Sequence, residues 1–277
     1  MRKLRISAIS YLNTAPLMWD FEHGEAGSHF EISYTIPSGC ARALAEGSGD
    51  IGIIPAAAYT QIPGLQILPD VAIASRRAVR SILLVSKVPL ERARTVALDT
   101  SSMTSVALCK ILLKWRGGER QYAPMEPELE KMLTSNDAAL VIGDPALQID
   151  RTRYYTLDLA EEWIRITGKP FVFAFWAVRG DAAVEADPAL DLAALFRDSR
   201  DHGLEPSNLN AITREWSAKL NLSEGQVRSY LTENIHYRLD AECLDGLQTF
   251  YRYAAEIDAL PAAPELHFLH SVRTLAG

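Results

Sequence analysis

Short apolar runs alternate with segments of helical periodicity through the first two thirds of the chain. Apolar runs of about four to eight residues are typical of buried strands, and apolar residues three or four positions apart are typical of one helix face. The alternation predicts an α/β protein with mostly parallel sheets. We expect strands at residues 3–9, 31–35, 50–54, 80–87, 94–98, 138–142 and 171–178.

Helix boundary signals lie between these runs. Pro37 opens a segment that ends at Gly47, and Ser101 and Ser102 precede another that ends at Gly117. Proline near the start of a helix and glycine just past its end are the usual asymmetry, so we expect a helix in each segment.

Beyond residue 188 the strand pattern stops and helical patterns take over. Ser223 and Gln226 have the spacing of a capping box. Asp240 heads a long amphipathic segment. We therefore expect a helical C-terminal part.

A chain of 277 residues is long enough for two domains of ordinary size. The runs at 80–87 and 171–178 bracket a self-contained α/β segment, and each has the position of a crossover strand between two lobes. We predict a discontinuous first lobe, residues 1–87 plus 176–277, with residues 88–175 inserted as a second lobe. Ligands of such proteins bind in the cleft between the lobes, at the carboxyl ends of strands.

The composition argues against several classes of protein. Lys and Arg number 28 and Asp and Glu number 35, so the net charge is −7, opposite to that of typical nucleic-acid binders. We find neither the apolar stretch of a secretory signal nor a segment suited to crossing a membrane. Cys40, Cys109 and Cys243 are far apart, which favours reduced thiols in a cytoplasmic protein.

Four polar turns follow predicted strands, and a cleft between two lobes would bring them together. They are Ser10 to Thr14, Ile53 to Ala56, Asp99 to Ser105 and Ile142 to Pro145. The third turn is rich in hydroxyl groups, which together with the free N–H groups of a helix start can bind a carboxylate or a phosphate. A helix cap alone also explains this turn, although four hydroxyl side chains in five residues exceed what one cap needs.

Three further residues have two interpretations each. Asn13 can orient a ligand or cap a helix, and the cap is the simpler interpretation. Ser81 can face the cleft or be an ordinary serine at a strand edge. Asp144 can be a catalytic acid or the cap of a helix that begins at Pro145.

No sequence motif points to a cofactor or a metal. The first strand is not followed by Gly-x-x-x-x-Gly-Lys or by Gly-x-Gly-x-x-Gly, so a nucleotide site is unsupported. The six histidines lie outside the four turns and lack metal-ligand spacing with cysteine, which argues against zinc and against a Ser-His-Asp hydrolase. The aromatic run Phe171, Phe173, Phe175 and Trp176 can line a ligand site, but alternate members must be core.

Several motifs occur in a characteristic order and spacing. They include Tyr11-Leu-Asn-Thr-Ala-Pro-Leu17, Val79-Arg-Ser-Ile-Leu-Leu-Val-Ser-Lys87, Ser101-Ser-Met-Thr-Ser-Val-Ala-Leu108, Ala138-Ala-Leu-Val-Ile-Gly-Asp144 and Gly168-Lys-Pro-Phe-Val-Phe-Ala-Phe-Trp176. Together they resemble the chorismate dehydratases of the futalosine route to menaquinone. The resemblance extends over nearly the whole chain.

The resemblance implies a two-lobed periplasmic-binding-protein type II fold in a cytoplasmic lyase without metal or organic cofactor. The implied substrate is chorismate and the implied product is 3-[(1-carboxyvinyl)oxy]benzoate. Asn13 and Ser81 are then the candidate catalytic residues. The candidate substrate-binding residues are Ser10, Thr14, Pro55, Ser101, Ser102, Met103, Thr104, Gly143, Asp144 and Trp176.

The turns offer few strong bases, since Asp50, Asp99 and Asp144 are their only nearby carboxylates. We therefore expect the enolpyruvyl carboxylate of the substrate to remove the ring proton while Asn13 holds it in place. Two alternatives stay open. One is the related 1,4-dihydroxy-6-naphthoate synthase, and the other is a non-catalytic protein that binds a small carboxylate.

Overall fold

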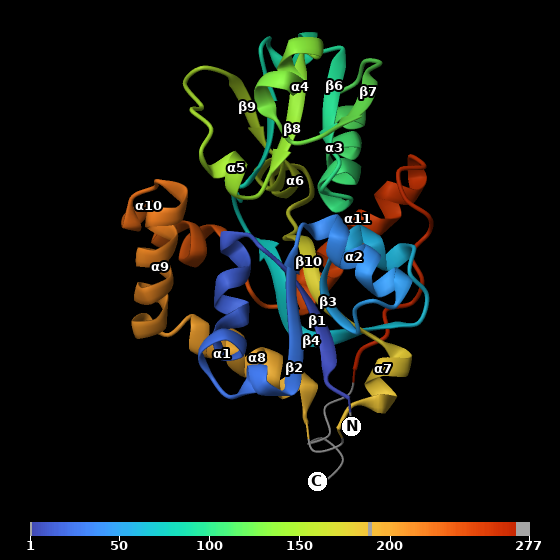
Figure 1. Ribbon diagram of the computed structural model, residues 1–277. Coiled ribbons are helices and arrows are strands. Elements are labelled where there is room, and N and C mark those ends of the chain that lie inside the picture. Colours follow the sequence, from blue (N-terminus) through green and yellow to red (C-terminus); the bar gives the residue numbers. More distant parts are fainter. Residues whose placement is uncertain (1, 188–189, 270–277) are drawn as a thin grey trace.

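The computed structural model describes residues 2–187 and 190–269, and its strands form two separate sheets (Figure 1). The first sheet has the order β2 (Phe30–Thr35), β1 (Leu4–Ile9), β3 (Ile51–Pro55), β10 (Phe171–Arg179) and β4 (Leu65–Ser75). The second has the order β7 (Gln121–Met125), β6 (Thr95–Asp99), β8 (Ala138–Ile142), β5 (Ile82–Ser86) and β9 (Tyr155–Asp158).

Helices surround both sheets. The α-helices are α1 (Trp19–His23), α2 (Pro37–Glu46), α3 (Thr104–Trp115), α4 (Leu129–Ser135), α5 (Asp144–Leu147), α6 (Leu159–Thr167), α7 (Gly180–Glu185), α8 (Leu192–Gly203), α9 (Pro206–Leu220), α10 (Glu224–Ser229) and α11 (Ala241–Glu256). Short 3-10 helices are η1 (Leu12–Met18), η2 (Ala26–His29), η3 (Ala56–Thr60) and η4 (Leu90–Arg92), and η5 (Tyr230–Asn234) is a π-helix.

The seven predicted strands are all present, and three further strands were not predicted. Residues 65–75 form one strand although Pro69 and Asp70 lie inside it, where Asp70 has a positive φ of 62°. The short strands β7 and β9 are partly exposed and lack an apolar run. The sheets are also less parallel than expected, because β10 is antiparallel to β3 and β4, and β5 is antiparallel to β8 and β9.

Most helix predictions are confirmed. Helix α2 begins at Pro37 and ends at Glu46, and Gly47 caps it with a φ of 72°, the left-handed conformation that glycine adopts without steric cost. Ser223 and Gln226 form the predicted capping box, and the Asp240 side chain accepts a hydrogen bond from the Cys243 N–H at the start of α11. In the described residues beyond 190, no further strand follows.

The chain passes from one sheet to the other before each predicted crossover strand and not within it. All five residues of β5 pair within the second sheet, and β10 lies wholly in the first. The chain therefore leaves the first sheet after Ser75 and returns to it at Phe171. The lobe limits of 1–87 plus 176–277 and 88–175 stay a prediction.

Aromatic packing joins the two layers, each of which is one sheet with the helices that pack on it. Trp163 of α6 is fully buried, and its ring lies 5.3 Å from the Phe171 ring of β10 and 6.4 Å from the Phe250 ring of α11. Buried aromatic pairs at such distances add to the hydrophobic stabilisation. The second sheet is therefore anchored to the first by a shared core.

Two side chains from the second layer cap helices of the first. The Asp144 carboxylate accepts a hydrogen bond from the N–H of Leu12 at 3.0 Å, at the start of η1. The Thr104 hydroxyl accepts one from the N–H of Ala57 at 3.0 Å, in the first turn of η3. The first N–H groups of a helix have no partner within it, and these side chains satisfy two of them. The ends of β1 and β3 are thereby fixed against β8 and α3.

A buried carboxylate fixes the opposite ends of β1 and β3. The Asp50 side chain is 1% exposed and accepts hydrogen bonds from the N–H, Nε and Nη2 of Arg5 and from both Nη atoms of Arg2. Burial alone would raise the pKa of Asp50, but these hydrogen bonds hold it well below its usual range. The ionised carboxylate therefore stabilises the fold above about pH 4, and this stability is lost on acidification.

We predict that Asp50→Asn lowers the free energy of unfolding at pH 7 by about 2 kcal/mol, because several hydrogen bonds lose their charged acceptor. The difference from wild type should shrink as the pH falls below 4. Urea denaturation at several pH values measures both. Glu128→Gln is the control, because its ion pair with Lys131 is exposed and contributes less than about 1 kcal/mol. Equal stability of Asp50→Asn and wild type would contradict this role.

A second prediction concerns Asp144, whose burial raises its pKa to about 6 from an ordinary value of 3.8. Because ionisation is harder in the folded state, this group should reduce stability as the pH rises from about 4 to about 6, by up to about 3 kcal/mol. Asp144→Asn keeps an oxygen for Leu12 but cannot ionise. The variant should therefore gain stability relative to wild type over this interval, and the exposed Asp150→Asn control should not. A constant difference between Asp144→Asn and wild type would contradict the prediction.

Candidate active site

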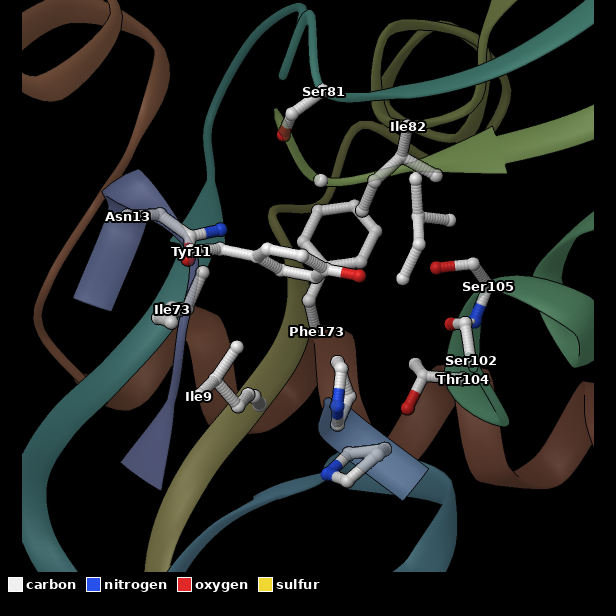
Figure 2. Close-up of a pocket in the computed structure, with 15 residues that line it drawn as sticks. Ile9, Tyr11, Asn13, Ile73, Ser81, Ile82, Ser102, Thr104, Ser105 and Phe173 are labelled. Carbon is white, nitrogen blue, oxygen red and sulfur yellow. Dashed lines mark hydrogen bonds between the residues drawn. The ribbon is translucent and has the colours of Figure 1, made fainter. Parts of the chain in front are cut away.

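A pocket lies between the two sheets, where β1 and β3 end and the second sheet begins. The space inside it that no protein atom occupies, open solvent included, is about 430 Å³. The apolar lining residues are Ile9, Pro37, Pro55, Ile73, Ile82, Ile142, Phe173 and Ala174. The remaining lining residues are Tyr11, Asn13, Ser81, Ser102, Thr104, Ser105 and Gly143 (Figure 2).

One tyrosine connects the two candidate catalytic residues. The hydroxyl of Tyr230 donates a hydrogen bond to Ser81 Oγ at 2.9 Å. Burial raises the pKa of Tyr230 above its usual range, while hydrogen bonds with Ser81 and Asn13 oppose this effect. Asn13 and Ser81 thus lie at one end of the pocket, as Figure 2 shows. Because Ser81 Oγ accepts from Tyr230, its own hydrogen is left to donate to a ligand.

Hydrogen bonds with two side chains hold the backbone before Ser81. Arg80 has a positive φ of 64°, and the Asp158 carboxylate accepts hydrogen bonds from the N–H groups of Val79 and Arg80 at 3.1 and 2.7 Å. Asn234 Nδ2 donates to the carbonyl of Ala78 at 2.8 Å. These hydrogen bonds position this segment, one of two connections between the sheets, so that Ser81 lines the pocket.

The start of α3 supplies hydroxyl groups from the other side of the pocket. Ser102 Oγ accepts a hydrogen bond from the Ser105 N–H at 3.2 Å, and both residues line the pocket. A helix N-terminus with hydroxyl side chains attracts anions through its free N–H groups and its dipole. The pocket therefore has polar groups at two ends, Asn13 and Ser81 at one and the start of α3 at the other, with apolar walls between them.

Gly143 allows Tyr11 to lie across the pocket. A Cβ atom on Gly143 would lie 2.6 Å from Cε2 of the Tyr11 ring, and Gly143 has a φ of 68°. A residue with a side chain at this position would clash with the Tyr11 ring and would also be strained by the positive φ, so glycine is required here. The ring of Tyr11 thus lies directly against the turn after β8.

The structure brings six of the predicted site residues to this pocket. They are Asn13, Pro55, Ser81, Ser102, Thr104 and Gly143. Among them, Thr104 already uses its oxygen to cap η3.

Six other predicted residues do not line the pocket. Ser10 and Thr14 line a neighbouring hollow beside Trp216, Ser101 is bonded to Asp99, and Met103 precedes α3. Asp144 is engaged by Leu12. Trp176 is fully buried, and its ring lies 4.7 Å from that of Phe196 on the other side of the sheet.

Tyr11, Ser105 and Tyr230 were not among the predicted site residues. The first two are neighbours in sequence of predicted residues, so the turns themselves could have indicated them. Tyr230 lies in the helical C-terminal part, far in sequence from any strand end, and no sequence signal distinguished it.

A separate cluster, His236, Asp240 and Cys243, has ligand atoms within 4.8 Å of one another, which the spacing analysis did not predict. Its groups have structural partners. Asp240 caps α11 and pairs with Arg76 and with His236 Nε2. Burial raises the pKa of the Cys243 thiol to about 12, which disfavours the thiolate that metals require. We conclude that these three residues stabilise the start of α11 and do not form a metal site.

Within residues 2–187 and 190–269, no helix combines the length and apolar character that crossing a bilayer demands.

Comparison with solved structures gives the fold family. A protein from Archaeoglobus fulgidus superposes with a TM-score of 0.71 at 16% identity, covering 92% of this chain and 97% of that one. The periplasmic aliphatic sulphonate binding protein from Escherichia coli superposes with a TM-score of 0.65 at 16% identity, covering 98% and 94%. At this identity the likeness concerns the fold alone, and it confirms the predicted periplasmic-binding-protein architecture.

Comparison of sequences gives a narrower result. The family described as "Menaquinone biosynthesis" matches residues 4–256. A chorismate dehydratase from Thermus thermophilus is 31% identical over 284 aligned positions, which cover 95% of this chain and 98% of the relative. The chain therefore belongs to the menaquinone-biosynthesis family.

Proposed function

We propose that this protein is a chorismate dehydratase of the futalosine route, a carbon–oxygen lyase that converts chorismate to 3-[(1-carboxyvinyl)oxy]benzoate and water. The observation that carries the proposal is the pocket, which has neutral hydrogen-bond donors at two ends and an apolar slot between them. The relationship to the Thermus thermophilus chorismate dehydratase over nearly the full length of both chains supports it.

Chorismate has the features that this pocket suits. It is a compact ring with two carboxylates, one on the ring and one on the enolpyruvyl side chain. Asn13 and Ser81 can bind the enolpyruvyl carboxylate, and the start of α3 with Ser102 and Ser105 can bind the ring carboxylate. The ring would lie against Ile9, Ile82 and their apolar neighbours. These apolar walls would exclude water from it.

The reaction removes the proton at the ring carbon that bears the ether and expels the hydroxyl group of the adjacent carbon. Among the described lining residues there is no carboxylate, histidine or lysine to act as the base. We therefore assign this role to the enolpyruvyl carboxylate of chorismate itself. Asn13 orients that carboxylate through its amide and Ser81 through its hydroxyl, and no cofactor takes part in this scheme.

One assay separates this proposal from its two alternatives. Purified protein is mixed with chorismate, and loss of the cyclic diene and formation of the benzoate are followed by absorbance and mass spectrometry. Turnover supports the dehydratase. Binding without conversion supports a carboxylate-binding protein. Inertness toward chorismate, with activity on the cyclic futalosine-derived intermediate, supports the naphthoate synthase.

We predict that Asn13→Ala lowers kcat/KM for chorismate by about 100-fold, because a misplaced base loses the advantage of its orientation. Ser10→Ala is the matched control, since Ser10 lies in the same turn but outside the pocket, and its hydroxyl donates a hydrogen bond to the Thr35 carbonyl. Steady-state rates of the two variants test the role. Full turnover by Asn13→Ala would disprove it.

We also predict that an analogue of chorismate in which the enolpyruvyl carboxylate is replaced by a carboxamide reacts at least about 100-fold more slowly, because a neutral amide cannot accept the ring proton. Inhibition constants against chorismate would measure whether the analogue still binds. Rapid aromatisation of the carboxamide would show that the protein, and not the substrate, supplies the base.

A further inference from the structure

Tyr11 projects into the pocket from the end of β1. Figure 2 shows its ring crossing the pocket, with the hydroxyl pointing toward the side on which Ser102, Thr104 and Ser105 lie. The ring is held against Gly143 from the second sheet. Its phenol group therefore lies at the wall of the pocket, within reach of a ligand bound there.

Burial raises the pKa of Tyr11, so the phenol keeps its proton at neutral pH.

Dehydration needs a proton for the departing hydroxyl group, because hydroxide is a poor leaving group. The other polar lining side chains in the described ranges are one amide and four alcohols, at Asn13, Ser81, Ser102, Thr104 and Ser105. A phenol, with an ordinary pKa near 10, is a far stronger acid than either of these classes. Tyr11 is therefore the strongest acid that the pocket presents to the substrate.

We propose that Tyr11 is the general acid of the dehydration. This inference rests on the proposed function. The electrons of the broken carbon–hydrogen bond form the new ring double bond as the carbon–oxygen bond breaks. The Tyr11 proton joins the departing hydroxyl to give water. After product release the substrate carboxyl loses the former ring proton to solvent, and the phenolate of Tyr11 takes up a proton from solvent.

The test is Tyr11→Phe, which removes only the hydroxyl group. We expect kcat with chorismate to fall by about 100-fold or more, as for loss of a general acid, while the affinity for the benzoate product, measured by calorimetry, changes less than about threefold. Tyr34→Phe, at an exposed tyrosine outside the pocket, is the control. A kcat within about threefold of wild type, or a loss of product affinity as large as the loss of kcat, would overturn the assignment.

If wild type itself does not convert chorismate, the proposed function fails; if wild type converts it and Tyr11→Phe does so equally well, only the present inference fails.

Discussion

The hydrogen bonds by which one layer caps the helices of the other determine the shape of the candidate site. Asp144 and Thr104 come from the second layer, yet they satisfy the N–H groups of Leu12 and Ala57 in the first. Each bond lies directly beside the pocket and links the end of a first-sheet strand to an element of the second sheet. A buried N–H without a partner destabilises a structure by about 1–3 kcal/mol. Opening the cleft would break these bonds, and each N–H that water did not then reach would carry that penalty. The same bonds that close the structure therefore place Asn13, Ser81 and α3 around one space.

Much of the fold follows from local sequence patterns, whereas the site depends on contacts between distant segments. The apolar runs predicted seven strands correctly, because a buried strand is locally apolar. β4 was missed because Pro69 and Asp70 resemble a turn, and only pairing with β10 shows that the strand continues through them. In the aromatic run, alternation predicts two faces but not which face meets a ligand. Phe173 lines the pocket while Trp176 packs into the core.

The site residues divide in the same way. Asn13 and Ser81 could be identified because they lie next to strand ends and within motifs of a known family. For Asp144, in contrast, a cap of the helix that begins at Pro145 was a simpler interpretation than a site residue, and the structure shows it capping a helix that begins more than a hundred residues earlier in the chain. No local pattern can identify a cap whose helix lies so far away in sequence. Tyr230 was missed for a related reason, since its partners belong to other segments.

The π-helix at residues 230–234 makes the site sensitive to chain length. Tyr230 bonds to Ser81 and Asn234 bonds to the carbonyl of Ala78, so two residues four positions apart face the same short segment. A π-turn contains one residue more than an α-turn, and removing it would rotate everything on one side by about 100°. A single-residue deletion in this turn would thus leave a good helix that presents the wrong side chains. Homologous chains that share the Asn13 and Ser81 arrangement should therefore vary in length on either side of this turn and not within it.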